Sequence, residues 1–195
     1  MAANTAPTLA DILELARSQK MTLADLFRVA EGRSAAGHKA EAAEIYKAWI
    51  AFNDGNPFLH LACFNYSVVL RQLGDVTGAI NALRTCVTLE GRFGAGHINL
   101  GRAYEDAGLA VQAIQQWRKF IEQTSDSTAE RVSYRLMALQ HVGRVMENAN
   151  LLEDAEATLW QAIELRPDKT EAGQHWTALR QRQCKWPIIT SSEHV

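Results

Sequence analysis

The stretch Asn99–Phe120, NLGRAYEDAGLAVQAIQQWRKF, joins two helical patterns through a turn signal. Gly108 marks the turn, because glycine readily adopts the left-handed backbone that ends a helix. Ala113 follows five residues later and Trp117 four residues after that. The small Ala allows two helices to approach closely, and the large Trp fills the space beneath them. The stretch therefore predicts a hairpin of two packed helices.

The same pattern occurs in three further segments, residues 36–50, 73–87 and 149–163. Their turn residues, with Gly108, are separated by 37, 34 and 42 positions: Gly37, Gly74, Gly108 and Asn150. Each turn residue is followed by Ala and then by a large residue: Ala42 and Tyr46, Ala79 and Leu83, Ala113 and Trp117, Ala155 and Leu159. Three of the preceding helices have a small residue seven positions before the turn: Ser67, Gly101 and Gly143. Repeated units of this length indicate a stacked array.

The predicted fold is all-α, because apolar residues recur at helical spacing and the prolines fall at boundaries. Four hairpins should stack into a right-handed solenoid with a concave inner surface. The predicted divisions are an N-terminal extra helix within 1–21, an array over 22–167, and a capping helix with a linker tail over 168–195. The repeats are placed at 23–56, 60–93, 94–127 and 136–167, after a polar loop at 124–130. The extra helix is expected over 8–19, with Thr8 as N-cap and Asp11 behind it, and the capping helix over 169–184.

Composition narrows the classes of function. Lys and Arg total 20 and Asp and Glu total 22 in 195 residues, so no basic surface for nucleic acid or an anionic membrane is expected. Cys63, Cys86 and Cys184 lie far apart, which suggests neither a disulfide framework nor a zinc site. The N-terminus has no signal-peptide pattern, and no long apolar run is present. We expect a cytoplasmic protein.

No catalytic or cofactor-binding motif is found in the sequence. Phosphate-binding loops, metalloprotease helices and nucleophile elbows are absent, and the histidines are scattered. We therefore predict no cofactor, no metal and no enzymatic activity for the chain by itself. Four tryptophans fall at core-like helical positions and are expected to be buried: Trp49, Trp117, Trp160 and Trp176.

Candidate binding residues lie on the first helix of each hairpin, which is expected to line the concave groove. Nine positions before the turn stand Arg28, Asn65, Asn99 and His141, and six positions before it stand Glu31, Val68, Arg102 and Arg144. A carboxamide can both donate to and accept from a peptide backbone. Arg102 and Arg144 could hold a carboxylate, although Glu105 and Glu147, three residues after each, could instead form local ion pairs. Asn65 and Asn99 could also simply tolerate exposed helix positions.

These features resemble the tetratricopeptide repeat, whose pattern is matched by Gly101, Tyr104, Gly108, Ala113 and Trp117. The first repeat departs most from it, because Arg33 replaces the usual aromatic residue. Residues 135–189 further resemble the bacterial SPINDLY-like O-GlcNAc transferases, in which a last repeat leads into a helix of the form HWxxLRQxQCxWP. The residues that match this form are His175, Trp176, Leu179, Arg180, Gln181, Gln183, Cys184, Trp186 and Pro187.

The second resemblance implies a function. In that family a repeat array recruits protein substrates, and a nucleotide-sugar transferase domain follows it. The chain would then be the substrate-recognition arm, and Cys184, Trp186 and Pro187 would dock a downstream catalytic domain, none of whose catalytic residues falls within the 195 residues. The alternative is a free-standing repeat scaffold that bridges proteins or forms a homodimer.

Overall fold

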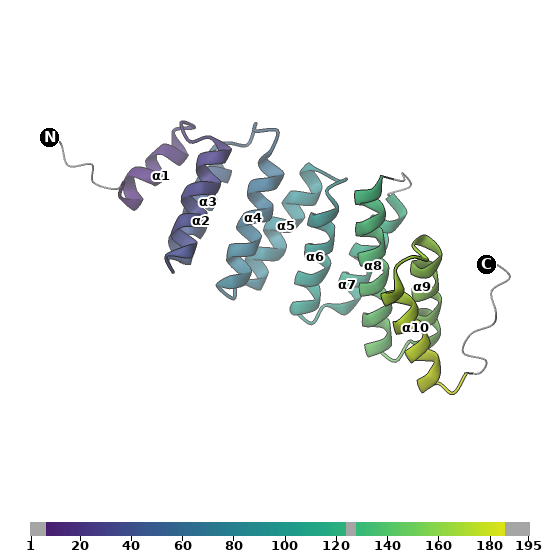
Figure 1. Ribbon diagram of the computed structural model, residues 1–195. Coiled ribbons are helices and arrows are strands. Elements are labelled where there is room, and N and C mark those ends of the chain that lie inside the picture. Colours follow the sequence, from purple (N-terminus) through teal and green to yellow (C-terminus); the bar gives the residue numbers. More distant parts are fainter. Residues whose placement is uncertain (1–6, 124–127, 186–195) are drawn as a thin grey trace. The chain divides into compact units, whose positions relative to one another are not determined.

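The computed structural model describes residues 7–123 and 128–185. Within these ranges the chain forms ten helices and no strand, so the predicted all-α class of stacked helical hairpins is confirmed (Figure 1). The chain divides into two compact units, Met1–Gly96 and His97–Val195. Each unit is described by itself below. We call the two helices of a hairpin its first and second helix.

The first unit contains α1 (Leu9–Arg17) and two hairpins, α2 (Leu23–Ala35) with α3 (Lys39–Phe52) and α4 (Leu59–Gln72) with α5 (Val76–Leu89). Helix α1 packs on α3, and α4 packs on both α3 and α5. One apolar cluster centres on Trp49, Leu26 and Ile45, none of which is exposed. The indole of Trp49 donates to the Met21 carbonyl at 2.9 Å, so this buried N–H is satisfied.

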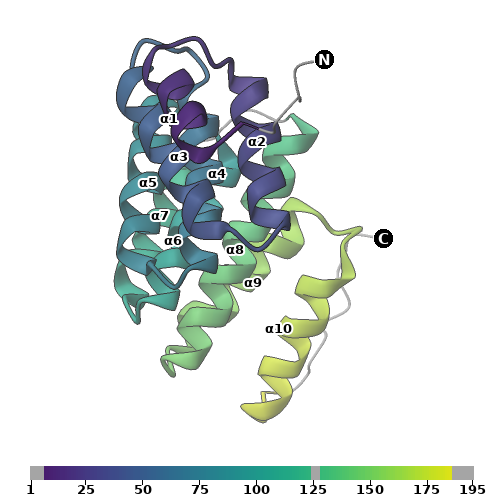
Figure 2. The same ribbon diagram turned by 90° about the vertical axis from the view of Figure 1, so that its left-hand side faces the viewer.

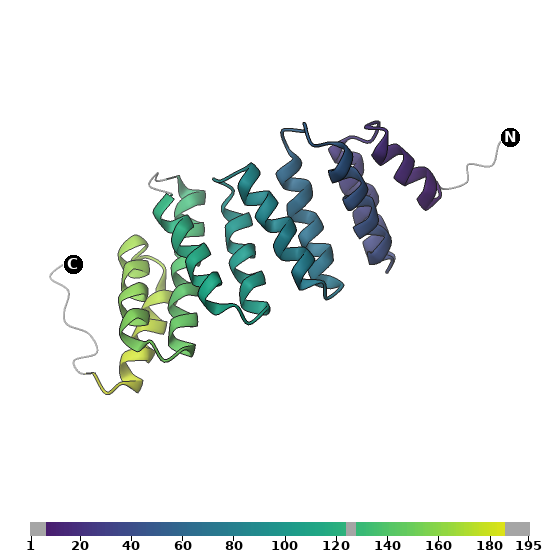
Figure 3. The ribbon, with the colours of Figure 1, turned by 180° about the vertical axis from the view of Figure 1, so that it is seen from behind.

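The second unit contains α6 (Gly94–Asp106) from His97 onward with α7 (Ala110–Gln123), α8 (Ala129–Asn148) with α9 (Leu152–Leu165), and α10 (Thr170–Arg182). Helix α8 packs against α7 and α9, and α10 packs against α9 (Figure 2). The core centres on Trp117, Phe120 and Leu159. Figure 1 shows this unit from the side of α6, α8 and α10, and Figure 3 from the side of α7 and α9.

Each first helix ends in the same turn. The turn residue has a positive φ, 89° at Gly37, 80° at Gly74, 74° at Gly108 and 60° at Asn150. The amide of the following residue donates to a carbonyl five residues earlier, as from Leu109 to Tyr104 at 2.8 Å and from Leu151 to Met146 at 2.9 Å. This geometry satisfies the last carbonyls of the helix and reverses the chain. The predicted left-handed turns are confirmed.

Helix α10 ends in this turn as well, but with Cys184 in the left-handed position at φ 54°. A side chain with a Cβ is disfavoured there. Cys184→Gly is therefore expected to raise the free energy of unfolding by about 0.5–1 kcal/mol, whereas Gly108→Ala should lower it by about 1 kcal/mol. Urea denaturation followed by circular dichroism measures both changes, and an unchanged midpoint for Gly108→Ala would show that the turn carries no such constraint.

Close approach within each hairpin follows the predicted pairs of small and large residues. All four alanines after the turns are fully buried, as are Leu83, Trp117 and Leu159. A Cβ on Gly101 would lie 2.1 Å from Nε1 of Trp117, and one on Gly143 would lie 2.9 Å from Cδ2 of Leu159. The second helix thus lies directly on the first at these positions.

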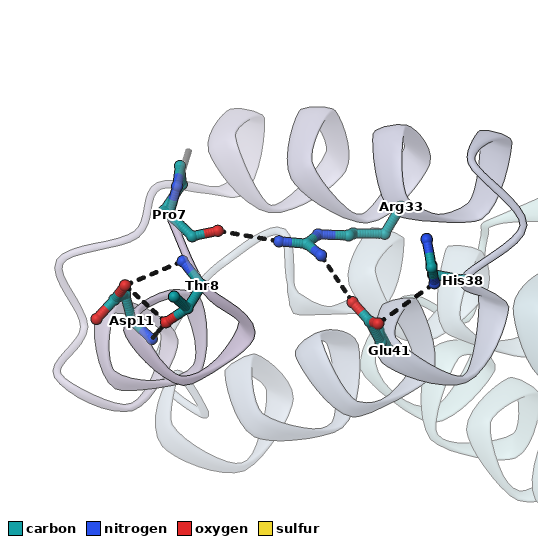
Figure 4. A network of polar contacts seen from close by, with 6 residues as sticks. All are labelled: Pro7, Thr8, Asp11, Arg33, His38 and Glu41. Carbon is teal, nitrogen blue, oxygen red and sulfur yellow. Dashed lines mark hydrogen bonds and ion pairs between the residues drawn. The ribbon is translucent and has the colours of Figure 1, made fainter. Parts of the chain in front are cut away.

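Arg33, which replaces the usual aromatic residue of the first repeat, links three segments of the first unit (Figure 4). Its guanidinium donates to Glu41 at 2.8 Å and to the Pro7 carbonyl at 3.0 Å. Beside it, Thr8 and Asp11 form the predicted capping box at the start of α1. An aromatic residue here would not make these polar contacts with the chain before α1.

Two expectations differ from the structure. Helix α8 begins at Ala129, so the last residues of the predicted polar loop are helical, while 124–127 lie outside the described residues. Glu130 in the first turn favours this earlier start, because acidic groups stabilise a helix N-terminus. Trp160 is 42% exposed rather than buried, and Trp176 is half-buried, because both border a pocket between α9 and α10.

Candidate functional site

The first helices of the second unit are tied to one another by ion pairs. Arg144 of α8 reaches across to Glu105 of α6, and its two terminal nitrogens each donate to a different carboxylate oxygen at 2.7 Å. A bidentate pair of this kind fixes both side chains in position. It also holds the pKa of Glu105 below its usual value, since Arg144 stabilises the carboxylate.

A second set of pairs joins α8 to α10. Glu147 contacts the His175 imidazole at 2.5 Å and pairs with Arg182. Arg144 and Glu147 are three residues apart on the same helix, yet each pairs with a residue of a neighbouring helix. The local pair between them, one of the alternatives that the sequence left open, therefore does not form. Stacking brings first helices side by side, and these inter-helix pairs make one connected polar surface on α6, α8 and α10.

His141 lies flat in this surface. Its ring stacks on Trp117, with centroids 4.9 Å apart and planes 13° apart, and its Nδ1 is 3.4 Å from an Arg144 terminal nitrogen. Burial lowers the pKa of His141, and the nearby charges of Arg144 and Arg102 lower it further, against a smaller opposing effect of Glu105. His141 is thus held in its neutral form near pH 7.

This lowered pKa gives a pH dependence with a defined sign. The unfolded chain takes up a proton at His141 near the ordinary value of 6.5, whereas the folded chain does so only at lower pH, so stability falls as the pH drops below that value. His141→Gln should therefore lose less stability than the wild type between about pH 7.5 and about pH 5.5. Urea midpoints at the two pH values test this, and equal losses in both proteins would contradict it.

The other candidates of the second unit lie on the same surface. Arg102 is exposed on α6, and within the described residues it has no ion pair. Asn99 is half-buried one turn earlier on α6. Asn99 and Arg102 on α6 correspond in register to His141 and Arg144 on α8. The structure therefore brings four of the six predicted peptide-binding residues onto two first helices of one unit. Whether they bind a peptide stays a prediction.

The remaining two candidates lie in the first unit. Asn65, on α4, is half-buried and its side chain is hydrogen-bonded to the hydroxyl of Tyr46, whose pKa burial raises to about 12. Arg28, on α2, is exposed and pairs with Asp25 at 2.7 Å. Both side chains thus have a contact within the first unit.

The predicted docking residues are only partly described. Cys184 is exposed in the turn after α10, whereas Trp186 and Pro187 lie outside the described residues. Sequence reasoning missed the pocket of about 660 Å³ between α9 and α10, whose walls include Trp160, Trp176 and Arg180. The Arg180 guanidinium lies 4.9 Å from the centre of the Trp176 ring. The sequence did contain a sign of a further turn at the end of α10, because Cys184 follows Asn150 by the repeat period of 34 positions.

Comparisons with known proteins give the fold a name. A tetratricopeptide repeat protein from Parabacteroides merdae ATCC 43184 superposes with a TM-score of 0.68 at 15% identity over 82% of this chain and 59% of that one. MamA 41-end from Desulfovibrio magneticus RS-1 superposes with a TM-score of 0.60 at 16% identity, over 91% of this chain and 88% of that one. A putative kinesin light chain with TPR-like repeats from Podosopora anserina superposes with a TM-score of 0.61 at 17% identity, over 84% of this chain and 87% of that one.

The fold is that of tetratricopeptide-repeat proteins. No protein-family model matches the sequence, and no curated protein matches it. At these identities the tetratricopeptide neighbours establish the fold alone. None of the described helices is long and apolar enough to span a membrane. In the same ranges, no group of three or more His, Cys, Asp or Glu side chains is placed to hold a metal ion.

Proposed function

We propose that this tetratricopeptide-type chain is a protein-interaction module that holds an extended peptide on the surface formed by α6 and α8. One observation carries the proposal. Side chains at the same register on neighbouring first helices, Asn99 with His141 and Arg102 with Arg144, lie on one surface that the Arg144–Glu105 pair holds in place. A surface fixed before binding loses little side-chain freedom when a ligand arrives.

The spacing of these side chains suits an extended chain. Packed helices lie roughly 8–10 Å apart, and an extended peptide advances roughly 3.3 Å per residue. Side chains at one register would therefore meet the peptide at about every third residue. The Asn99 carboxamide can serve both a backbone N–H and a backbone C=O.

Charge favours a peptide with an acidic group. Arg144 is paired with Glu105 and His141 is neutral, so among these four side chains Arg102 is the cation that has no ion pair with another described residue. A ligand carboxylate, from an acidic side chain or a C-terminus, would bind Arg102 through charge-assisted hydrogen bonds. We propose the residues at the corresponding register of the first unit, Asn65 and Arg28, as a separate and weaker site.

Peptide display against the immobilised chain tests the proposal. Peptides enriched on the wild type should bind the Asn99→Ala/Arg102→Ala variant at least about tenfold more weakly, because hydrogen bonds to a charged group contribute about 1.5–3 kcal/mol. The matched control is Gln115→Ala/Lys119→Ala, which removes two exposed side chains of α7 in the same unit.

The two variants separate the outcomes. Loss of binding in the α6 variant with retention in the α7 variant supports the proposed surface. Retention in the α6 variant would exclude it. Equal loss of binding in both variants, with unchanged thermal unfolding, would mean that the peptides bind by non-specific electrostatic or hydrophobic attraction rather than at a defined surface.

We further propose that the chain acts by binding rather than by catalysis, as the substrate-recognition arm of a SPINDLY-like O-GlcNAc transferase. Support comes from the residues of the HWxxLRQxQCxWP form, of which those from His175 to Gln183 fall on α10 or directly after it. The alternative is a free-standing scaffold or dimerisation protein. Reading the frame beyond codon 195 distinguishes them: several hundred further codons with a nucleotide-sugar site favour the transferase, and an immediate stop favours the scaffold.

A further inference from the structure

Helix α10 has the register of a first helix. Its turn residue, Cys184, follows Asn150 by 34 positions, and its closing hydrogen bond, from Lys185 to the Arg180 carbonyl at 3.1 Å, matches those of the four hairpins. The buried positions match as well. Ala172 and Leu179 lie twelve and five positions before the turn, as do Ala138 and Val145 of α8, and all four are less than 5% exposed.

Two other positions of α10 differ from their equivalents. In α8, the residues eight and four positions before the turn are Val142 and Met146, which are buried. The hydroxyl of Thr158 on the second helix, α9, lies 3.7 Å from the Met146 sulfur. In α10 the same positions are Trp176 and Arg180, and they line the open pocket of about 660 Å³. The pocket therefore lies where the second helix of a hairpin would pack on α10.

We propose that α10 is the first helix of a fifth hairpin position and that the pocket receives the segment Trp186–Ile189 of this same chain. The inference is independent of the peptide-binding proposal, because it concerns the surface between α9 and α10 rather than the surface of α6 and α8.

The end of α10 directs the chain toward the pocket. In the four complete hairpins the second helix begins two residues after the turn residue and packs back along the first helix. The turn at Cys184 has the same geometry as far as Lys185. Lys185 already lies at the pocket rim, where its Nζ is 2.8 Å from Glu156 of α9.

Charge and composition fit this occupant. The charged side chains of the pocket balance, with Glu153 and Glu156 against Arg180 and Lys185, so an uncharged ligand suits it. Residues 186–189 are Trp, Pro, Ile and Ile. They bring apolar surface to the two tryptophans, Trp160 and Trp176, whose ring centroids are 5.2 Å apart. Pro187 also lacks a backbone N–H, which leaves one fewer donor to satisfy on burial.

Length fits too. The α9 side of the pocket runs from Glu156, where Lys185 is held, to Gln161, roughly 7–8 Å at 1.5 Å per helical residue. Two to three extended residues after Lys185 span about that distance. A full second helix is therefore not required.

Disulfide formation between engineered cysteines tests the proposal in the full chain. Ala157→Cys, on the α9 wall, is combined with Ile188→Cys, in a Cys184→Asn background that removes the exposed native thiol. The control pairs Ile188→Cys with Ala178→Cys, an exposed site on α10 away from the pocket. Because docking raises the effective concentration of the tethered segment at the pocket, the Ala157 pair should close at least about tenfold faster than the control pair.

Each outcome is informative. Faster intramolecular closure at Ala157 supports docking of the segment. Equal rates at the two sites would mean that the segment samples the surface without preference, and no closure at Ala157 would place it elsewhere; both overturn the proposal. A disulfide-linked dimer through Ala157 would also overturn it, because a second copy would then occupy the pocket. Circular dichroism and thermal unfolding of both variants establish that they fold alike.

Discussion

Trp117→Ala is expected to lower the free energy of unfolding by about 3–5 kcal/mol, the typical cost of removing a fully buried tryptophan. Trp117 is not exposed at all. Its indole donates to the Ile98 carbonyl at 3.2 Å and its ring supports His141. The substitution leaves a cavity, removes the indole hydrogen bond and leaves His141 unsupported. Urea denaturation measured by circular dichroism gives the difference.

The control for this substitution is Trp160→Ala. Trp160 is 42% exposed, and its indole bonds only to Glu164, on its own helix, among the described residues. Its removal should cost about 1 kcal/mol, since much less apolar surface leaves contact. Equal losses for the two variants would show that Trp117 does not hold the core of the second unit.

Gly101→Ala should also destabilise the protein, by about 1–3 kcal/mol. The added Cβ would lie 2.1 Å from Nε1 and 2.2 Å from Cε2 of Trp117, so the helices α6 and α7 must separate. Helix propensity acts in the opposite direction, because Ala favours a helix over Gly by about 1 kcal/mol. The steric cost is expected to exceed this gain.

Gly32→Ala isolates the propensity term. Gly32 lies within α2, is exposed, and a Cβ there would have no atom within 4 Å. This substitution should raise the free energy of unfolding by about 0.5–1 kcal/mol. A gain at both glycines would contradict the close approach of α6 and α7, whereas a loss at Gly101 beside a gain at Gly32 confirms it.

Most of the fold could be predicted from the sequence because it depends on local signals. A turn such as Gly108, a small Ala113 and a large Trp117 act within one hairpin, and their spacing is visible along the chain. The start of α8 was missed because the polar residues at 124–130 suggested a loop. Residues 129–135 contain no Gly or Pro that would break a helix, and the helix begins at Ala129. Trp160 was assigned to the core because helical spacing alone does not reveal whether another element covers a face.

The candidate site was predicted less well because its contacts are not local. Arg144 and Glu105 are 39 residues apart, and stacking brings them together in preference to Arg144 with Glu147, a local pair that the sequence left open. The register of His141 with Asn99 was readable from the turns, but its stacking on Trp117 was not. The turn after α10 was not recognised because its turn residue is Cys184 rather than Gly or Asn.

The most direct test of the proposed function is nuclear magnetic resonance of the isotope-labelled chain titrated with a peptide enriched by display. We predict that chemical-shift changes concentrate at Asn99, Arg102 and His141, with the Arg102 guanidinium and the Trp117 indole among the side-chain signals that move. Changes confined to α7 and α9, with these signals unmoved, would contradict a peptide-binding surface on the first helices.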